Sequence, residues 1–116
     1  MAYIDGFLIA VPKAKLDDYR KMAELGEKVW REHGAIAYVE SVGDDLRDGE
    51  LTSFPRAVMA KDDEVVIFSW IVYPSREARD ATNAKVMSDP RLVGQMEMPF
   101  DAKRLIFGGF RPLLGL

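Results

Sequence analysis

The chain has 116 residues, of which 48% are hydrophobic and 30% are charged, and its formal net charge is −3. This length suits one core that buries roughly two-thirds of the unfolded surface, so we expect a single domain over residues 1–116. The sequence contains no cysteine, which excludes disulfides, a thiolate metal site and a Cys nucleophile. Its acidic balance disfavours nucleic acid and an anionic membrane surface as partners.

The first residues predict a strand and not a secretory signal. The segment from Met1 to Asp5 contains no basic residue, and Asp5 and Gly6 interrupt the apolar run. No apolar run in the chain reaches the roughly 18 residues that a membrane span requires. We therefore expect a cytoplasmic protein.

The first half of the chain predicts a strand, a helix and a second strand. Residues 3–11 are rich in aliphatic and aromatic side chains and are followed by Pro12. Apolar side chains recur at three- and four-residue steps over residues 14–33, and Gly34 marks the end of that helix. Residues 36–42 form the second predicted strand, which leads into a polar loop.

The second half contains the strongest strand signal. Residues 65–73 are apolar except for Ser69, whereas residues 54–60 are ambiguous between a strand and a helical turn. The last predicted strand covers residues 103–110. Its paired glycines at 108 and 109 indicate a bulge or a close approach of other atoms to the backbone.

A second helix is predicted over residues 76–87. Ser75 can cap its first turn, and Asp89 followed by Pro90 ends it. Three small residues recur at three-residue steps along this helix, which predicts a face that packs closely on the sheet: Ala78, Ala81 and Ala84.

The two halves also echo each other in sequence. A shift of 62 positions places Ile9, Val11, Pro12 and Asp18 over Ile71, Tyr73, Pro74 and Asp80. Strand, proline and helix start then coincide, so the halves are expected to be structural copies. The order strand, helix, strand, given twice, predicts an α+β, ferredoxin-like split βαβ fold in which an antiparallel sheet carries two helices on one face.

Residues 65–73 are apolar on both sides of the strand, although a sheet with helices on one face should alternate apolar and polar residues. The open face therefore needs a cover. We expect a second copy of the chain to provide it, which makes the protein a homodimer. The alternative is that residues 54–60 fold over this central strand.

Ionisable residues inside predicted strands are the candidates for a binding site. A charge on a packed surface must be paired, solvated in a cavity or shifted in pKa. We predict a small-molecule pocket at five side chains: Asp5, Tyr38, Glu40, Trp70 and Arg104. One carboxylate would act as a base and Arg104 would hold an anionic group. The alternative is that the three charged residues only form salt bridges or face solvent.

Other polar features favour structural roles. His33, the only histidine, could be a general base or a metal or haem ligand, but its place in the last helical turn favours a surface role. A calcium site is disfavoured in the acidic loop because the spacing differs from that of the calcium-binding loop: Asp44, Asp45, Asp48 and Glu50. The usual nucleotide-binding, metalloprotease and hydrolase motifs are absent, so we predict no metal and no cofactor.

The predicted fold also raises RNA recognition as an alternative. Residues 104–110, RLIFGGF, are similar to the aromatic RNP1 pattern of RNA recognition motifs. They lie on the last strand and not on the third, and the chain is acidic, so we do not favour this function.

Five stretches resemble the bacterial family catalogued as domain of unknown function 1428, the YbaA-like proteins. They are YIDGFLIAVP at 3–12, VESVGDD at 39–45, DEVVIFSWIVYPSREARD at 63–80, MSDPR at 87–91 and MPFDAKRLIFGGF at 98–110. The resemblance covers nearly the whole chain, and the tail after Phe110 lies beyond it.

The resemblance implies a ferredoxin-like fold in the dimeric α+β barrel superfamily, and it implies no established activity. Relatives in that superfamily include cofactor-independent monooxygenases and haem-degrading enzymes, but this chain has no set of Asn, His and Trp at the positions that those haem sites use. We therefore expect a dimeric barrel with a pocket that binds or transforms a small molecule. The alternative is a non-catalytic dimerisation or regulatory module without a ligand.

Overall fold

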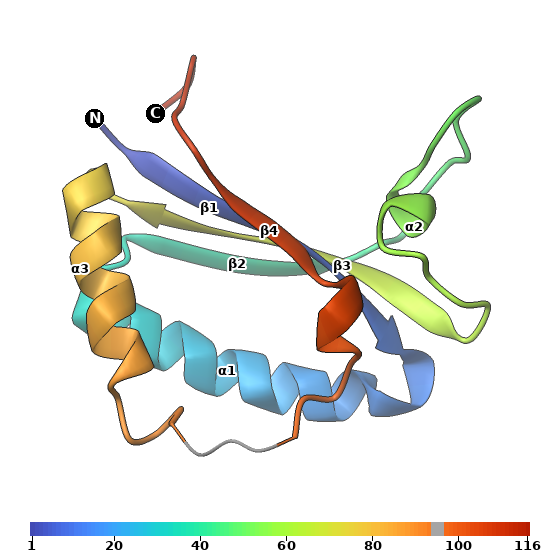
Figure 1. The fold of residues 1–116 in the computed structure, drawn as a ribbon, viewed down its shortest axis with the longest axis horizontal. Helices are drawn as coiled ribbons and strands as arrows, with labels where there is room; N and C mark the ends of the chain where they lie inside the picture. Colours follow the sequence, from blue (N-terminus) through green and yellow to red (C-terminus); the bar gives the residue numbers. More distant parts are fainter. Residues whose placement is uncertain (94–96) are drawn as a thin grey trace.

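A computed structural model describes residues 1–93 and 97–116 of the chain. One antiparallel sheet has the order β2-β3-β1-β4, which places the two long strands at its centre (Figure 1). This is the predicted ferredoxin-like α+β arrangement. The strand bounds are β1 (Tyr3–Pro12), β2 (Ala37–Val42), β3 (Glu64–Tyr73) and β4 (Ile106–Phe110).

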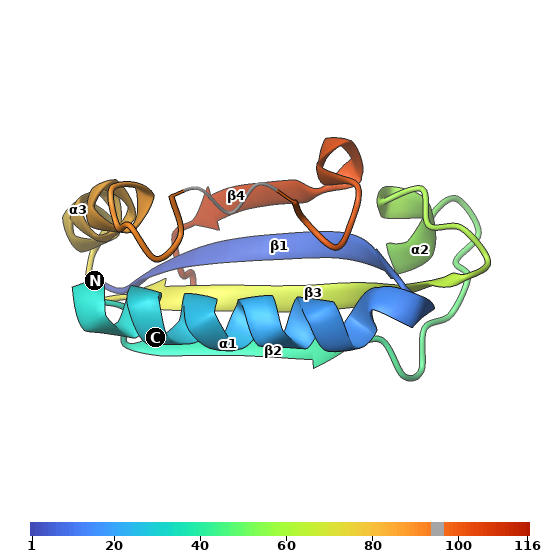
Figure 2. The same cartoon turned by 90° about the horizontal axis from the view of Figure 1, so that it is seen from below.

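The helices lie mainly on one side of the sheet. In Figure 1, α1 (Leu16–His33) runs below the sheet and α3 (Arg76–Met87) stands at one end of it. Figure 2 shows that residues 97–105 run beside α1, beneath β1 and β4. The short α2 (Phe54–Ala57) lies on the other side. None of the helices in the described part of the chain has the length and apolar character that a membrane crossing requires.

The helix ends follow from local sequence signals. The Ser75 hydroxyl accepts a hydrogen bond from the Ala78 amide at 3.0 Å, which confirms the predicted cap of α3. Gly34 ends α1 with φ at 132°, a backbone conformation that side chains disfavour. The two halves differ at the helix starts, because a 3-10 turn (Lys13–Lys15) precedes α1 whereas α3 follows its cap directly.

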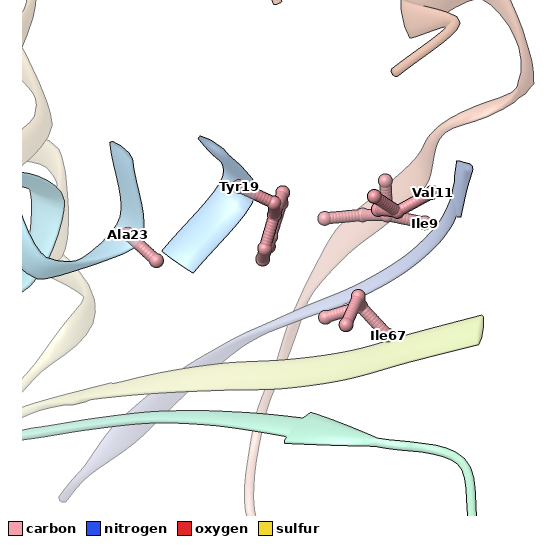
Figure 3. Close-up of a cluster of buried hydrophobic side chains, with 5 residues drawn as sticks. All are labelled: Ile9, Val11, Tyr19, Ala23 and Ile67. Atoms are coloured by element: carbon pink, nitrogen blue, oxygen red, sulfur yellow. The ribbon is translucent and has the colours of Figure 1, made fainter. Parts of the chain in front are cut away.

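The main core lies between α1 and the two central strands. Tyr19 and Ala23 of α1 meet Ile9, Val11 and Ile67 of β1 and β3 (Figure 3). All five residues are buried, and Val11 is fully so. Burying each large apolar side chain is worth roughly 1.5–3 kcal/mol, so this cluster holds α1 against the sheet.

Strand pairing decides which side chains share a face. Tyr38 pairs with Ile71 across β2 and β3, and these residues face the helices together with the core. The neighbouring Trp70 and Phe68 on β3 point to the open face. The segment that contains α2 covers only one end of that open face, where Val58 packs on Ala10 and Val66. Residues 54–60, whose sequence is ambiguous, thus cover part of the open face.

Two sequence predictions are wrong, one about the packed face of α3 and one about the start of the last strand. The buried residues of α3 are Thr82 and Val86, whereas Ala81 and Ala84 are exposed, because α3 packs at the end of the sheet beside the end of α1. The Thr82 hydroxyl donates to the His33 carbonyl at 3.0 Å and helps to fix this position. The last strand also begins later than predicted, at Ile106, after a 3-10 turn (Ala102–Arg104).

Candidate functional site

A cavity of about 340 Å³ lies between the sheet and the structures below it. Strands β1, β2 and β3 form its roof, and α1, α3 and residues 97–105 form its walls. The lining is almost entirely apolar and includes Phe7, Trp30, Val86, Met98 and Phe100. A volume of this size and a lining of this kind are typical of small-molecule sites.

Glu40 supplies the carboxylate in this apolar lining. It projects from β2 toward the helices, and the Tyr19 hydroxyl of α1 donates to its Oε1 at 2.7 Å. The Tyr38 hydroxyl, two residues earlier on the same face of β2, donates to its Oε2 at 2.9 Å. Ser69 lies directly across on β3 and adds a third hydroxyl. We call Tyr19, Tyr38 and Glu40 the carboxylate triad.

The environment of the carboxylate triad raises the pKa values of all three side chains. Burial is the largest cause of the raised pKa of Glu40, and the hydroxyl hydrogen bonds from Tyr19, Tyr38 and Ser69 oppose it. Burial and the nearby Glu40 carboxylate also raise the pKa values of both tyrosines. Both phenols therefore remain neutral hydrogen-bond donors at physiological pH.

Gly26 makes room for the carboxylate triad. A Cβ at Gly26 would lie 2.8 Å from the Tyr38 hydroxyl oxygen, whereas the next atoms are at ordinary contact distances of 3.6 and 3.8 Å. A glycine in the middle of a helix costs about 1 kcal/mol relative to alanine. At this position the cost is offset because the hydroxyl of Tyr38 can reach Glu40.

A double-mutant cycle tests this contact. We expect Gly26→Ala alone to destabilise the protein by about 1 kcal/mol, since overpacking of a well-packed site outweighs the gain in helix propensity. In a Tyr38→Phe background the clashing oxygen is gone, so the same change should stabilise the protein by up to about 1 kcal/mol. Urea denaturation measures both values, and an equal effect in the two backgrounds would contradict the contact.

Asp5 belongs to a second, separate polar cluster at one end of the sheet. The Tyr73 hydroxyl donates to its Oδ2 at 2.9 Å, and the Arg79 Nε donates to its Oδ1 at 3.1 Å. Asn83 links this cluster to Trp30, whose indole nitrogen donates to the Asn83 Oδ1 at 3.2 Å. Asp5 is thus a buried, paired carboxylate that ties β1 to α3.

The close approach predicted at the paired glycines occurs beside this cluster. A Cβ at Gly109 would overlap Arg79 and Tyr3, and the guanidinium of Arg79 lies over the Tyr3 ring at 4.9 Å. Strand β4 pairs with β1 in register through both glycines. Gly109 therefore serves close packing, whereas a Cβ at Gly108 would meet only Phe110, at an ordinary contact distance of 3.8 Å.

Arg104 belongs to a third cluster, in which protein groups occupy its guanidinium. Its guanidinium donates two hydrogen bonds of 2.7 Å to the Glu64 carboxylate, and it also contacts Asp101 at 3.0 Å. A further bond of 2.9 Å reaches the Met59 carbonyl. These bonds hold the pKa of Glu64 at about 2. Arg104 lies in the 3-10 turn and not in a strand, which is the reason why its predicted placement is wrong.

The structure therefore does not bring the five predicted pocket residues together. Tyr38 and Glu40 line the cavity. Trp70 lies on the opposite face of the sheet, where its ring is 5.2 Å from that of Phe68. Asp5 and Arg104 sit in the two salt-bridged clusters, which agrees with the alternative of structural ion pairs for these two residues.

Sequence reasoning missed two residues of the site and one residue of the separate Asp5 cluster. Tyr19 belongs to the apolar stripe of the predicted helix. A buried tyrosine hydroxyl usually needs a hydrogen-bond partner, and this requirement is the signal that could have identified it. A glycine in the middle of a helix, Gly26, signals a close approach. Asn83 carried no signal that pattern or spacing could show.

The sequence favours a surface position for His33, whereas its side chain is only 26% exposed and is paired with Asp89. The His33 ring lies 2.8 Å from the Asp89 carboxylate, which also receives two hydrogen bonds from the Arg91 side chain. The hydrogen bonds from Arg91 and His33 lower the pKa of Asp89 well below its ordinary range. The loop from Asp44 to Glu50 is exposed. Within residues 1–93 and 97–116, no group of three or more acidic or histidine side chains is arranged to hold a metal ion.

Solved structures with the same fold support the architecture. A protein titled Rv0793 from Mycobacterium tuberculosis superposes with a TM-score of 0.54 over 99% of this chain and 98% of its own, at 15% sequence identity. A dimeric ferredoxin-like protein from an uncultured marine organism superposes with a TM-score of 0.55 over 100% and 98%, at 12% identity. At these identities the likeness shows the fold alone.

Sequence comparison shows the family. The uncharacterised protein YbaA of Escherichia coli K12 is 50% identical over 115 residues, which cover 98% of both chains, and YbaA of Shigella flexneri matches equally. The tail after Phe110 is therefore largely shared with these relatives and is not an addition. The family model described as "Protein of unknown function (DUF1428)" matches residues 2–102. The chain thus belongs to the DUF1428 family, as its sequence stretches predict.

Proposed function

We propose that this protein binds a small, largely apolar molecule in the cavity below the sheet, with Glu40 as the group that orients it. The observation that carries the proposal is a cavity of about 340 Å³ whose described lining is apolar and aromatic and contains one carboxylate, Glu40. Ligand sites combine a large apolar surface with few, well-placed polar groups, and Glu40 is fixed by hydroxyls from α1 and β2.

The proposal includes a homodimer that closes over the open face of the sheet. Several large apolar side chains on or beside that face are exposed, by 45% for Phe68, 60% for Phe110 and 44% for Ile106. Monomeric proteins rarely leave an apolar patch of this kind uncovered, and a structural neighbour is itself described as dimeric. The cavity lies on the other side of the sheet, so each copy would keep its own ligand site.

A thermal-shift experiment with a blocking variant tests the ligand site. Phenethyl alcohol is a suitable first probe because it is small, aromatic and has one hydroxyl. A ligand present at 100 times its Kd adds roughly 2.7 kcal/mol of stability, so the melting temperature should rise in proportion to log concentration. Met22→Trp places a ring in the cavity lining and should abolish the shift.

Leu25→Trp is the matched control, because Leu25 is also a half-buried residue of α1 but is not part of the lining. This variant should keep the full thermal shift. An equal shift in all three proteins would place the probe elsewhere. No shift with any of a panel of small alcohols, phenols and amines would favour the second candidate, a dimerisation or regulatory module without a ligand.

A further inference from the structure

The chemistry around Glu40 restricts the ligand class. Tyr19 and Tyr38 each donate to a different carboxylate oxygen, at 2.7 and 2.9 Å, and Ser69 adds a third hydrogen bond, so the two oxygens together still have acceptor capacity for a ligand. The phenols that donate to both oxygens favour the ionised form of Glu40, and an ionised carboxylate only accepts hydrogen bonds. A ligand group that meets these oxygens must therefore be a donor.

The carboxylate also lacks a cation of its own. Among the residues that the structure describes, the lining of the cavity below the sheet includes no lysine, arginine or histidine. A second groove, which Glu40 also lines, contains Arg20, and the guanidinium of Arg20 is paired with Glu24 at 3.3 Å. Buried charges in proteins are normally paired with an opposite charge.

This groove, on the other side of the carboxylate triad, is also negatively charged. It shares Tyr19, Tyr38 and Glu40 with the cavity, and its lining adds three carboxylates and one guanidinium: Asp17, Glu24, Glu27 and Arg20. Glu24 is paired with Arg20 at 3.3 Å and Glu27 with Arg31 at 3.2 Å, so carboxylates outnumber cations. The surface that leads to Glu40 is therefore acidic on balance. Such a field attracts a cationic ligand and repels an anionic one.

We propose that the cavity takes an apolar amine, whose ammonium group donates to Glu40 and supplies the missing positive charge while its hydrocarbon part fills the space below the sheet. The aromatic lining adds to this preference, because the rings of Trp30 and Tyr38 stand side by side at 6.1 Å and can face a cation. This inference rests on the proposed function and narrows it to one chemical class.

Three probes of similar size separate the ligand classes: phenethylamine, phenethyl alcohol and phenylacetate. We expect phenethylamine to bind at least about tenfold more tightly than the alcohol, since a charge-assisted hydrogen bond is about twice as strong as a neutral one. Phenylacetate should bind most weakly because its carboxylate meets that of Glu40. Isothermal titration calorimetry at neutral pH measures all three affinities.

The variant Glu40→Gln decides whether Glu40 is responsible. The amide keeps the size of the side chain and an oxygen that can accept from one tyrosine, but it removes the charge. Phenethylamine should lose at least about tenfold in affinity, whereas phenethyl alcohol should change by no more than about threefold. Glu50→Gln, which removes one charge from the exposed loop and touches neither the cavity nor the groove, should leave the amine affinity nearly unchanged.

The outcomes distinguish the two proposals. Binding of phenethyl alcohol in the cavity with no advantage for the amine would overturn the amine inference and leave the proposed function standing. Equal binding of phenylacetate, or an amine affinity that does not respond to Glu40→Gln, would also overturn it. If none of the three probes binds, both the inference and the proposed small-molecule site fail.

Discussion

Replacing Phe68 by aspartate is expected to convert the proposed homodimer into a monomer. Phe68 lies near the middle of the open face, 45% exposed, and its ring contacts those of Phe54 and Trp70 at 6.2 and 5.2 Å. Central aromatic residues carry much of the binding energy of an interface, and a carboxylate in that place would be buried without a partner. We expect the dissociation constant to rise at least about a hundredfold.

Phe107→Asp is the matched control for this change. Phe107 is even more exposed, at 72%, but it lies on the opposite face of the sheet, where its ring stacks on Phe7. Size-exclusion chromatography with light scattering at micromolar concentration should give a dimer for the parent and for this control, and a monomer for Phe68→Asp. A monomeric parent, or a dimer that survives Phe68→Asp, would contradict an interface on the open face.

Arg104→Ala is expected to cause the largest loss of stability among single substitutions of charged residues. The change removes a bidentate partner from the Glu64 carboxylate, which is only 3% exposed, and leaves the Met59 carbonyl without its donor. Breaking a buried pair from one side leaves an uncompensated charge, and we expect the melting temperature to fall by about 10 °C. Arg47→Ala breaks an exposed pair with Asp45 and should shift it by no more than about 2 °C.

The same ion pair predicts a pH dependence. The pKa of Glu64 falls from its ordinary 4.5 to about 2 in the folded protein, so the pair contributes fully above about pH 4.5 and is lost as the pH falls toward 2. The difference in stability between the parent and Arg104→Ala should therefore shrink over this range. Denaturation curves at neutral pH and near pH 3 measure it, and a constant difference would contradict the assigned role of the pair.

The sequence predicts most of the fold because its elements carry local signals. The helix over 76–87 has a capping serine and appears with the predicted bounds, and both central strands end at or just before a proline. The predicted start of the last strand is too early because residues 103–105 are apolar or basic. Only the capping side chain of Asp101 indicates the 3-10 turn. The orientation of α3 depends on tertiary packing, which its alanine spacing does not encode.

The candidate site could be predicted only in part. Tyr38 and Glu40 stand two apart on one strand, so their shared face follows from the strand period. Placing Trp70 on the same face required the register of β2 against β3, which pairs Trp70 with Val39 and not with Tyr38. Two partners of Arg104, Glu64 and Met59, lie 40 residues or more away along the chain, and no local pattern reveals such pairs.

The most direct test of the ligand site is NMR of the protein labelled with methyl-¹³C methionine, titrated with phenethylamine. Met22, Met87 and Met98 line the cavity, whereas Met59 is exposed beside α2 on the other side of the sheet. We predict chemical-shift changes and ligand contacts at the three lining methyl groups and none at Met59. Saturating changes at Met59 alone, or no change at any lining methyl group, would contradict a ligand site below the sheet.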